Sequence, residues 1–139
     1  MTVALTDISR CFEGSIPSII VTSSIDGEPN VAHLSQVFFV DDQHVATSNQ
    51  FFAKTVANLA ANPLATLLCP DPADMVTYKM LVRHEGTQRE GALFESARAS
   101  IDAIAALTGM SEVFALKAMD VFRVLNIEVA APRPPDQPS

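Results

Sequence analysis

Three segments rich in β-branched residues follow one another between residues 16 and 49, and their close spacing is the strongest constraint on the fold. The segment "IPSIIVTSS" predicts a first strand, "NVAHLSQVFFV" a long second strand and "HVATS" a third. The turns "IDGEPN" and "DDQ" between them are far shorter than the dozen or more residues of a parallel crossover. The sequence therefore predicts an antiparallel meander.

Three further strands are expected in "LATLLCP", "MVTYKMLVRHEGT" and "MDVFRVLNIEVA". Six strands without crossovers suggest a small barrel, because a sheet that closes on itself has no exposed edges. The predicted fold class is mainly β (α+β): a small antiparallel barrel of about six strands with two to three peripheral helices. We expect one domain over residues 1–130, because 139 residues is close to the commonest domain size. The tail 131–139 has four prolines in nine residues, which predicts disorder or a linker.

Apolar residues at helical spacing predict the peripheral helices. Leu5, Ile8 and Phe12 indicate a short N-terminal helix. The segment "QFFAKTVANLAAN" predicts a helix that ends before Pro63. The segment "GALFESARASIDAIAAL" predicts a third. The expected apolar faces of these last two helices are Phe52, Val56, Leu59 and Ala60 in the first, and Leu93, Ala97, Ile101, Ile104 and Ala105 in the second.

The composition excludes several classes of function. The net charge is −7 and no basic stripe is visible, which argues against nucleic-acid binding. No apolar run approaches the length of a membrane span, and no secretory signal is apparent. Cys11 and Cys69 lie far apart without CxxC spacing, which predicts reduced, buried thiols in a cytoplasmic protein. His33, His44 and His84 are too scattered to suggest a zinc or haem site.

The most site-like feature is the corner where the third strand meets the following helix. Thr47, Ser48 and Asn49 offer hydroxyl and amide donors there, and a helix N-terminus attracts anions. With Ser48 or Asn49 as the N-cap, Lys54 would lie in the second turn, off the apolar face, and Asn58 would share its polar face. The corner could hold a phosphate. Equally, Ser and Asn are ordinary helix caps, and Lys54 could be a solvated lysine.

The remaining polar residues suggest structural roles. Arg83 and Glu85 share one strand face, where an ion pair is the ordinary explanation. His33 is expected to be a structural histidine of the second strand. No Gly-rich phosphate loop, nucleophile elbow or zinc-protease motif is present. No nucleophile–base pair can be nominated, so the catalytic residues stay unknown.

The ordered set of elements resembles the pyridoxamine 5′-phosphate oxidase-like, FMN-binding split-barrel family. The resemblance covers residues 16–129. It rests on the Asp-Gly-x-Pro turn after the first strand, the Asp-rich turn after the second, and a helix that contains Lys-x-x-x-Asn-Leu and closes on Asn-Pro. The later "LVRHEG" is similar to that family's Val-Arg-x-Glu-Gly strand.

This resemblance implies a six-stranded antiparallel split β-barrel with two to three peripheral helices. It also implies a homodimer that binds FMN in the groove between its subunits, with electron chemistry supplied by the flavin. The flavin ring would lie along the second strand, and the phosphate would be held at the strand–helix corner. The implied cofactor-binding residues are His33, Leu34, Ser35 and Gln36 for the ring, and Thr47, Ser48, Asn49 and Lys54 at the corner.

The chain also departs from the family pattern. Phe52 and Ala53 stand where the oxidase has a serine and an arginine. Ala32 and Val37 replace an arginine and a lysine, and Leu81 replaces the glutamine that meets the ring. Two functions are therefore expected: an FMN-dependent oxidoreductase acting on an unknown small molecule, or a non-catalytic ligand-binding or sensory module with weak or no flavin binding.

Overall fold

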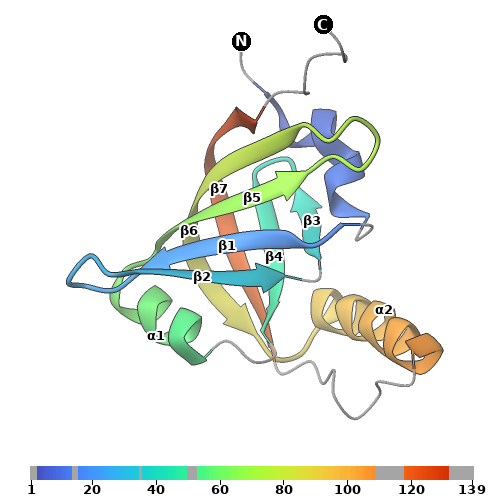
Figure 1. Ribbon diagram of the computed structural model, residues 1–139. Helices are drawn as coiled ribbons and strands as arrows, with labels where there is room; N and C mark the ends of the chain where they lie inside the picture. Colours follow the sequence, from blue (N-terminus) through green and yellow to red (C-terminus); the bar gives the residue numbers. More distant parts are fainter. Residues whose placement is uncertain (1–2, 14–15, 35, 50–52, 109–117, 132–139) are drawn as a thin grey trace, which may run out of the picture.

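The computed structural model describes residues 3–13, 16–34, 36–49, 53–108 and 118–131. It contains seven strands and three helices in these parts of the chain (Figure 1). The helices are η1 (Leu5–Phe12), α1 (Ala53–Ala61) and α2 (Ala92–Thr108). The strands are β1 (Ser18–Ser23), β2 (Pro29–Leu34), β3 (Val37–Asp41), β4 (His44–Asn49), β5 (Leu64–Pro70), β6 (Thr77–Gln88) and β7 (Ala118–Ala131).

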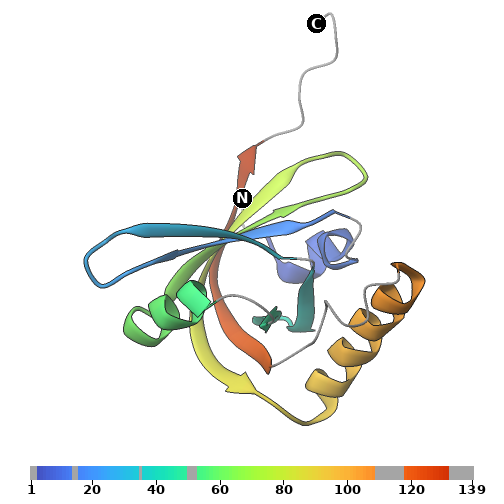
Figure 2. The same ribbon diagram turned by 60° about the horizontal axis from the view of Figure 1, so that its bottom comes forward.

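The seven strands form one antiparallel sheet in the order β2-β1-β5-β6-β7-β4-β3. β2 and β3 are consecutive in the chain and yet form its opposite edges. Only three peptide units join Leu34 to Val37, so these edges lie within about 11 Å of each other there. The sheet must therefore curl into a barrel, as Figure 2 shows. Within the described residues no ladder joins β2 to β3, so the barrel is split.

This architecture confirms the predicted fold class. The strand number is seven instead of six because the expected second strand is divided into β2 and β3, and Gln36 lies outside both. Pairing explains the division, since β2 bonds to β1 while β3 bonds to β4. One continuous strand cannot serve both edges of a curled sheet. β7 continues to Ala131, one residue into the predicted tail, and residues 132–139 lie outside the described part.

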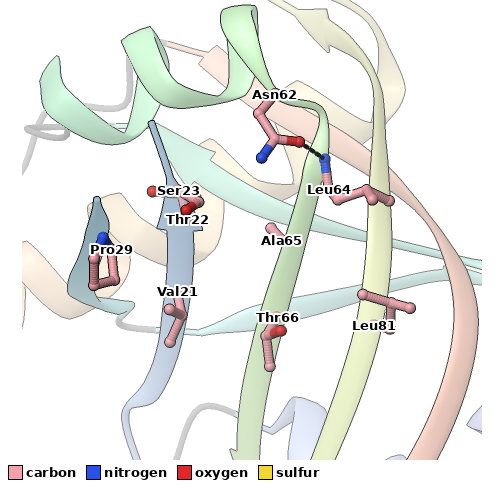
Figure 3. Close-up of a pocket in the computed structure, with 9 residues that line it drawn as sticks. All are labelled: Val21, Thr22, Ser23, Pro29, Asn62, Leu64, Ala65, Thr66 and Leu81. Carbon is pink, nitrogen blue, oxygen red and sulfur yellow. Dashed lines mark hydrogen bonds between the residues drawn. The ribbon is translucent and has the colours of Figure 1, made fainter. Parts of the chain in front are cut away.

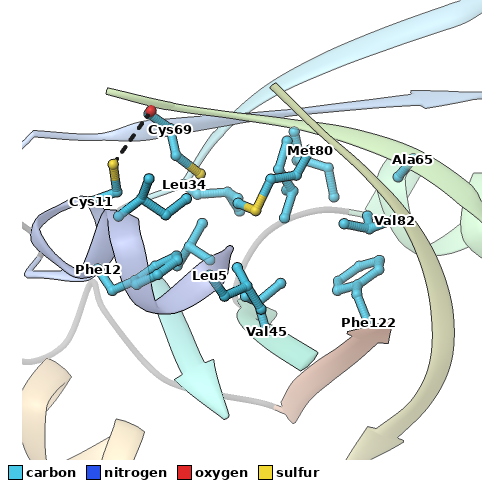
Figure 4. Packing of buried hydrophobic residues seen from close by; sticks show 14 of the residues in the cluster. Leu5, Cys11, Phe12, Leu34, Val45, Ala65, Cys69, Met80, Val82 and Phe122 are labelled. Atoms are coloured by element: carbon cyan, nitrogen blue, oxygen red, sulfur yellow. Dashed lines mark hydrogen bonds between the residues drawn. The ribbon is translucent and has the colours of Figure 1, made fainter. Parts of the chain in front are cut away.

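The barrel interior is a single apolar cluster (Figure 4). Leu67, Met80, Val82 and Phe122 are fully buried in it. Their positions follow strand alternation, which places every second side chain on the inner face. η1 adds Leu5, Ile8, Cys11 and Phe12 from one end of the barrel. The predicted N-terminal helix is thus confirmed, as a 3₁₀ helix with a kink at Ile8.

A smaller cluster lies on the outer face of β4 and β7, where α2 covers it. Phe94 and Ala97 of α2 pack there with Ala46 and Met119. The predicted helix is confirmed, and Ala97 faces the sheet as expected. Phe94, absent from the expected apolar face, is also buried. The side chains of Ile101, Ile104 and Ala105 lie outside the described part.

Helix α1 lies at the opposite end of the barrel from η1 (Figure 1). Its predicted apolar face is wrong in part. Leu59 is buried, but Val56 is 41% exposed and Ala60 is also exposed. The buried residues beside Leu59 are polar, Thr55 and Asn58, because this helix is fastened to β1 and β2 by hydrogen bonds.

Candidate functional site

The break between β2 and β3 is the first part of the candidate site. Leu34 ends β2 with its side chain buried in the core, while His33 points outward and is exposed. The Gln36 side-chain amide donates from Nε2 to the carbonyl oxygen of Phe12 at 2.8 Å, which ties the break to η1. Ser35 lies outside the described residues. Leu34 and Gln36 therefore fix the chain on either side of the break. The edge strands β2 and β3 approach each other there.

The end of β4 is the second part. Thr47 pairs with Val37, the first residue of β3, and with Asp120 of β7. The end of β4 therefore lies next to the break between β2 and β3. Ser48 and Asn49 also pair with β7, so both are strand residues. The described part of the helix begins at Ala53 and residues 50–52 lie outside the described part, so the expected N-cap at Ser48 or Asn49 stays a prediction. The side chain of Asn49 lies outside the described part.

Strand geometry sends Thr47 and Ser48 to opposite faces of the sheet, although both are buried. Thr47 shares the inner face with Val45 of the barrel core, and Ser48 shares the outer face with Ala46 beneath α2. From these positions the two hydroxyls cannot both reach one phosphate. Their role as phosphate contacts stays a prediction.

A cluster of three polar side chains beside Thr47 is not expected from the sequence. The Asp120 carboxylate, in register with Thr47, accepts hydrogen bonds at Oδ1 from Thr87 Oγ1 at 2.7 Å and from His84 Nε2 at 3.0 Å. The hydroxyl of Thr87 also lies 3.4 Å from the same imidazole nitrogen. Because one nitrogen faces both partners, the histidine cannot relay a proton between them as in a catalytic triad. Only the pairing of β6 with β7 brings these residues together, and sequence spacing does not show it.

Lys54 lies on α1 and is 66% exposed, with Nζ 3.5 Å from Glu28 Oε1. Glu28 precedes β2, whereas His33 lies near its end, about 17 Å further along an extended strand. The lysine therefore lies toward the start of β2, far from the break.

Two buried hydrogen-bond pairs hold the helix that carries Lys54. Asn58 Nδ2 donates to Thr22 Oγ1 at 3.1 Å, and Asn30 Nδ2 donates to Thr55 Oγ1 at 3.2 Å. Asn58, expected to share the polar face of Lys54, is 6% exposed and faces β1, so that face is buried at Asn58. The helix orientation is thus fixed by polar groups.

A shallow hollow of about 220 Å³ lies on the outer face of β1, β5 and β6 (Figure 3). Leu64 and Leu81 form one side of it, and Val21 and Pro29 the other. Leu81, which the resemblance in the sequence aligns with the ring-contacting glutamine of the oxidase, is 41% exposed. Five of the nine residues that line the hollow are apolar, four are polar and none is charged.

The outer face also carries a charged group around His44. Its Nδ1 lies 2.8 Å from Asp41 Oδ1 and its Nε2 lies 2.9 Å from Glu85 Oε1. The hydrogen bond with Asp41, followed by that with Glu85, raises the pKa of His44 above its usual value. The Gln43 amide, followed by His44, lowers the pKa of Asp41. The expected ion pair between Arg83 and Glu85 is wrong, since Glu85 contacts His44 instead.

The two thiols are free and buried, as the sequence predicts. Burial raises the pKa of both Cys11 and Cys69 to about 12. Such thiols stay protonated near neutral pH and are poor nucleophiles. Neither cysteine offers reactive chemistry to the site.

A family model for pyridoxamine 5′-phosphate oxidase matches residues 6–131. A search of curated proteins finds no match. In the described part of the chain, no helix is long and apolar enough to span a membrane.

Solved structures share the fold at low sequence identity. An FMN-binding protein from Syntrophomonas wolfei is 19% identical with a TM-score of 0.74, over 89% of this chain and 83% of that one. HupZ from Group A Streptococcus is 17% identical with a TM-score of 0.69, over 97% and 100%. HutZ, a heme storage protein from Vibrio cholerae, is 15% identical with a TM-score of 0.53, over 93% and 95%.

These likenesses establish the fold, and the family match extends over most of the chain, including both parts of the candidate site. The family resemblance seen in the sequence is thereby confirmed. The chain belongs to the pyridoxamine 5′-phosphate oxidase family.

Proposed function

We propose that this protein is a homodimeric, FMN-binding flavoprotein of oxidoreductase type. The observation that carries the proposal is the split itself. β2 and β3 are both edge strands, and they meet between Leu34 and Val37 beside the end of β4. The relative from Syntrophomonas wolfei, which is described as FMN-binding, supports the choice of flavin.

Edge strands suit the flavin ring because they carry backbone N–H and C=O groups without ladder partners. The polar side of an isoalloxazine ring alternates hydrogen-bond donors and acceptors, which such groups can match. We assign the ring to the backbone of residues 33–36, with the exposed imidazole of His33 at its border. These contacts are made by the backbone. The loss of the family's arginine and lysine at Ala32 and Val37 is therefore compatible with ring binding.

The phosphate end has fewer suitable groups. Lys54 is the assigned cation, and its surface ion pair with Glu28 is weak enough for a phosphate to displace. Thr47, Ser48 and Asn49 end β4 beside the break, away from Lys54, so one hydroxyl there would contact another part of FMN while Lys54 neutralises the phosphate. The Asp120 carboxylate next to Thr47 opposes an anion, although His84 and Thr87 offset part of its charge. These residues fit FMN, with a weaker hold on the phosphate than an arginine clamp gives.

A second copy of the chain would complete the groove. Val31 on β2 is 62% exposed and Phe39 on β3 is 44% exposed, so both edges beside the split carry uncovered apolar side chains. Ile25, at the tip of the β1–β2 hairpin, is 81% exposed. Exposed apolar groups of this kind are typical of surfaces that pair with a partner.

When bound, FMN supplies the capacity to accept and donate electrons. The chain's part is to hold the ring at the split, to neutralise the phosphate with Lys54 and to exclude water with the apolar edges. We assign no acid–base residue, because Asp120, His84 and Thr87 bond to one another on the inner face.

The test is an FMN titration of the full chain, followed by flavin fluorescence, with Lys54→Ala compared against Lys79→Ala. Lys79 is the matched control because it is an exposed lysine in a surface ion pair with Glu128. We expect Lys54→Ala to weaken FMN binding about tenfold or more, since charge-assisted hydrogen bonds contribute about 1.5–3 kcal/mol. Lys79→Ala should leave it unchanged. Equal affinities in both variants would remove Lys54 from the site.

Two further measurements separate an oxidoreductase from a non-catalytic module. FMN-dependent oxidation of reduced nicotinamide supports an oxidoreductase, whereas FMN binding without turnover favours the module. Hemin is the second ligand to titrate, because HutZ is described as a heme storage protein. Saturable hemin binding without FMN binding would contradict the proposal.

A further inference from the structure

Two arginines lie directly opposite each other on the outer face of β6 and β7. Arg83 and Arg123 are register partners in neighbouring strands, and both are exposed. Like charges at such positions repel each other and destabilise the sheet. Within the described residues neither guanidinium forms an ion pair. An oxyanion between them would turn this repulsion into attraction.

Carboxylates are plentiful in the chain, so a shortage of acidic residues does not explain why these two arginines are unpaired among the described residues. The chain has 16 acidic and 9 basic residues. On the same face Lys79 pairs with Glu128 at 2.7 Å. On the other side of the arginines, Asp41 and Glu85 are both engaged by His44. The nearby carboxylates are therefore committed elsewhere, and the two guanidinium groups face solvent.

The hollow on the outer face adjoins this arginine pair. Leu64 is the register partner of Arg83, so their Cβ atoms lie about 5 Å apart. Leu81 precedes Arg83 by two residues and points to the same face. Both leucines line the hollow (Figure 3). An apolar recess and two unpartnered cations thus form one continuous surface.

We propose that this surface binds a small organic oxyanion, with its apolar body in the hollow and its phosphate or carboxylate group on Arg83 and Arg123. Guanidinium groups bind both kinds of oxyanion through paired N–H donors. The hollow, at about 220 Å³, is smaller than the roughly 300–1,000 Å³ of sites for drug-sized ligands. The ligand is therefore no larger than a single ring with one anionic group. Its two arginines are not among the residues assigned to FMN, although Leu81 in the hollow stands where the family's oxidase has its ring-contacting glutamine.

Phenyl phosphate is the probe, added to the full chain labelled with ¹⁵N and followed by amide chemical shifts. We expect saturable shifts confined to β5, β6 and β7 around Leu64, Arg83 and Arg123. Inorganic phosphate lacks the apolar body and phenol lacks the oxyanion, so each should bind about tenfold more weakly or worse. Benzoate in place of phenyl phosphate shows whether a carboxylate serves as well.

The double variant Arg83→Gln, Arg123→Gln should weaken phenyl phosphate binding about tenfold or more. The control is Arg98→Gln, which removes an exposed arginine of α2 that has Asp102 as its neighbour. Unchanged affinity in the double variant, or no saturable shifts in the wild type, overturns the proposal. FMN affinity, measured on the same variants, should stay unchanged, so failure of one site is distinguished from failure of the other.

Discussion

Helices η1 and α1 lie at opposite ends of the same barrel and are attached by different chemistry (Figure 1). η1 buries Leu5, Ile8, Cys11 and Phe12, so its attachment is apolar. α1 buries Thr55 and Asn58 beside Leu59, and hydrogen bonds to Asn30 and Thr22 hold it. The first attachment gains mainly from the removal of apolar surface from water, and the second mainly from directional bonds.

The two ends of the barrel therefore differ in how firmly each fixes the orientation of its helix. Apolar packing tolerates rotation of a helix as long as the volume stays filled, whereas buried hydrogen bonds fix one orientation. α1 carries Lys54, the cation assigned to the FMN phosphate, so a fixed orientation matters at this end. Local sequence rules are expected to fail most often at functional sites, and α1 is where the helical-face rule fails.

The largest expected effect tests the apolar attachment. Ile8→Ala should lower the free energy of unfolding by about 2–5 kcal/mol, because it leaves a cavity under η1. Urea unfolding, followed by circular dichroism, measures the change. Leu125→Ala is the control, since Leu125 is 47% exposed and its truncation should cost well under half as much. A loss below about 1 kcal/mol for Ile8→Ala would mean that η1 is only loosely attached.

The next effect tests the polar attachment. Asn58→Ala should cost about 1–3 kcal/mol, because the hydroxyl of Thr22 is left buried without its donor. A double-mutant cycle with Thr22→Val should show a coupling of about 0.5 kcal/mol or more. Asn126→Ala, at an exposed position, is the control. Strict additivity of Asn58→Ala and Thr22→Val would contradict a bond that fixes α1.

A third contact, between charged groups, can be compared with these two attachments through the pH dependence of the free energy of unfolding. His44 links the β3–β4 hairpin to Glu85 of β6, and its pKa is raised in the folded protein. A raised pKa means that its stabilisation is complete below the unfolded value of about 6.5 and is lost as the pH rises through the folded value. The stability difference between wild type and His44→Gln should therefore shrink as the pH rises above the unfolded pKa of about 6.5.

His33→Gln is the control for this pH series, because His33 is exposed on β2 and has no carboxylate partner among the described residues. This variant therefore shows the effect of replacing a histidine without breaking a contact to a carboxylate. A His44→Gln difference that grows as the pH rises would reverse the expected sign and contradict the assignment.

The smallest expected effect separates binding from stability at the α1 end. Lys54→Ala should change the free energy of unfolding by less than about 1 kcal/mol, since its pair with Glu28 is an exposed one. The same change should weaken FMN binding, as proposed above. A loss of stability as large as that of Asn58→Ala would show that Lys54 helps to anchor the helix.

The sequence predicted the parts of the fold that follow from periodicity and turn length. Short turns required antiparallel pairing, and the spacing of Leu5, Ile8 and Phe12 predicted the buried side of η1. The break at Gln36 was not predictable from pattern, because "NVAHLSQVFFV" keeps its β character through it. Only closure of the barrel, a property of the whole sheet, divides the segment.

Less of the candidate site could be predicted. Thr47 was identified because polar residues at a strand–helix corner are a local signal. The cluster of Asp120, His84 and Thr87 was not predictable, because only the pairing of β6 with β7 brings these distant residues together. The buried face of α1 was misjudged for the same reason, since the partners of Thr55 and Asn58 lie more than twenty residues away in sequence.

The absorption spectrum of the freshly purified full chain tests the central claim, flavin binding at the split, most directly. The account predicts the two bands of oxidised flavin, and release on denaturation of a yellow compound that co-elutes with FMN in chromatography. If the protein is colourless and added FMN does not bind saturably, the flavin assignment is contradicted, while the fold and family remain as described.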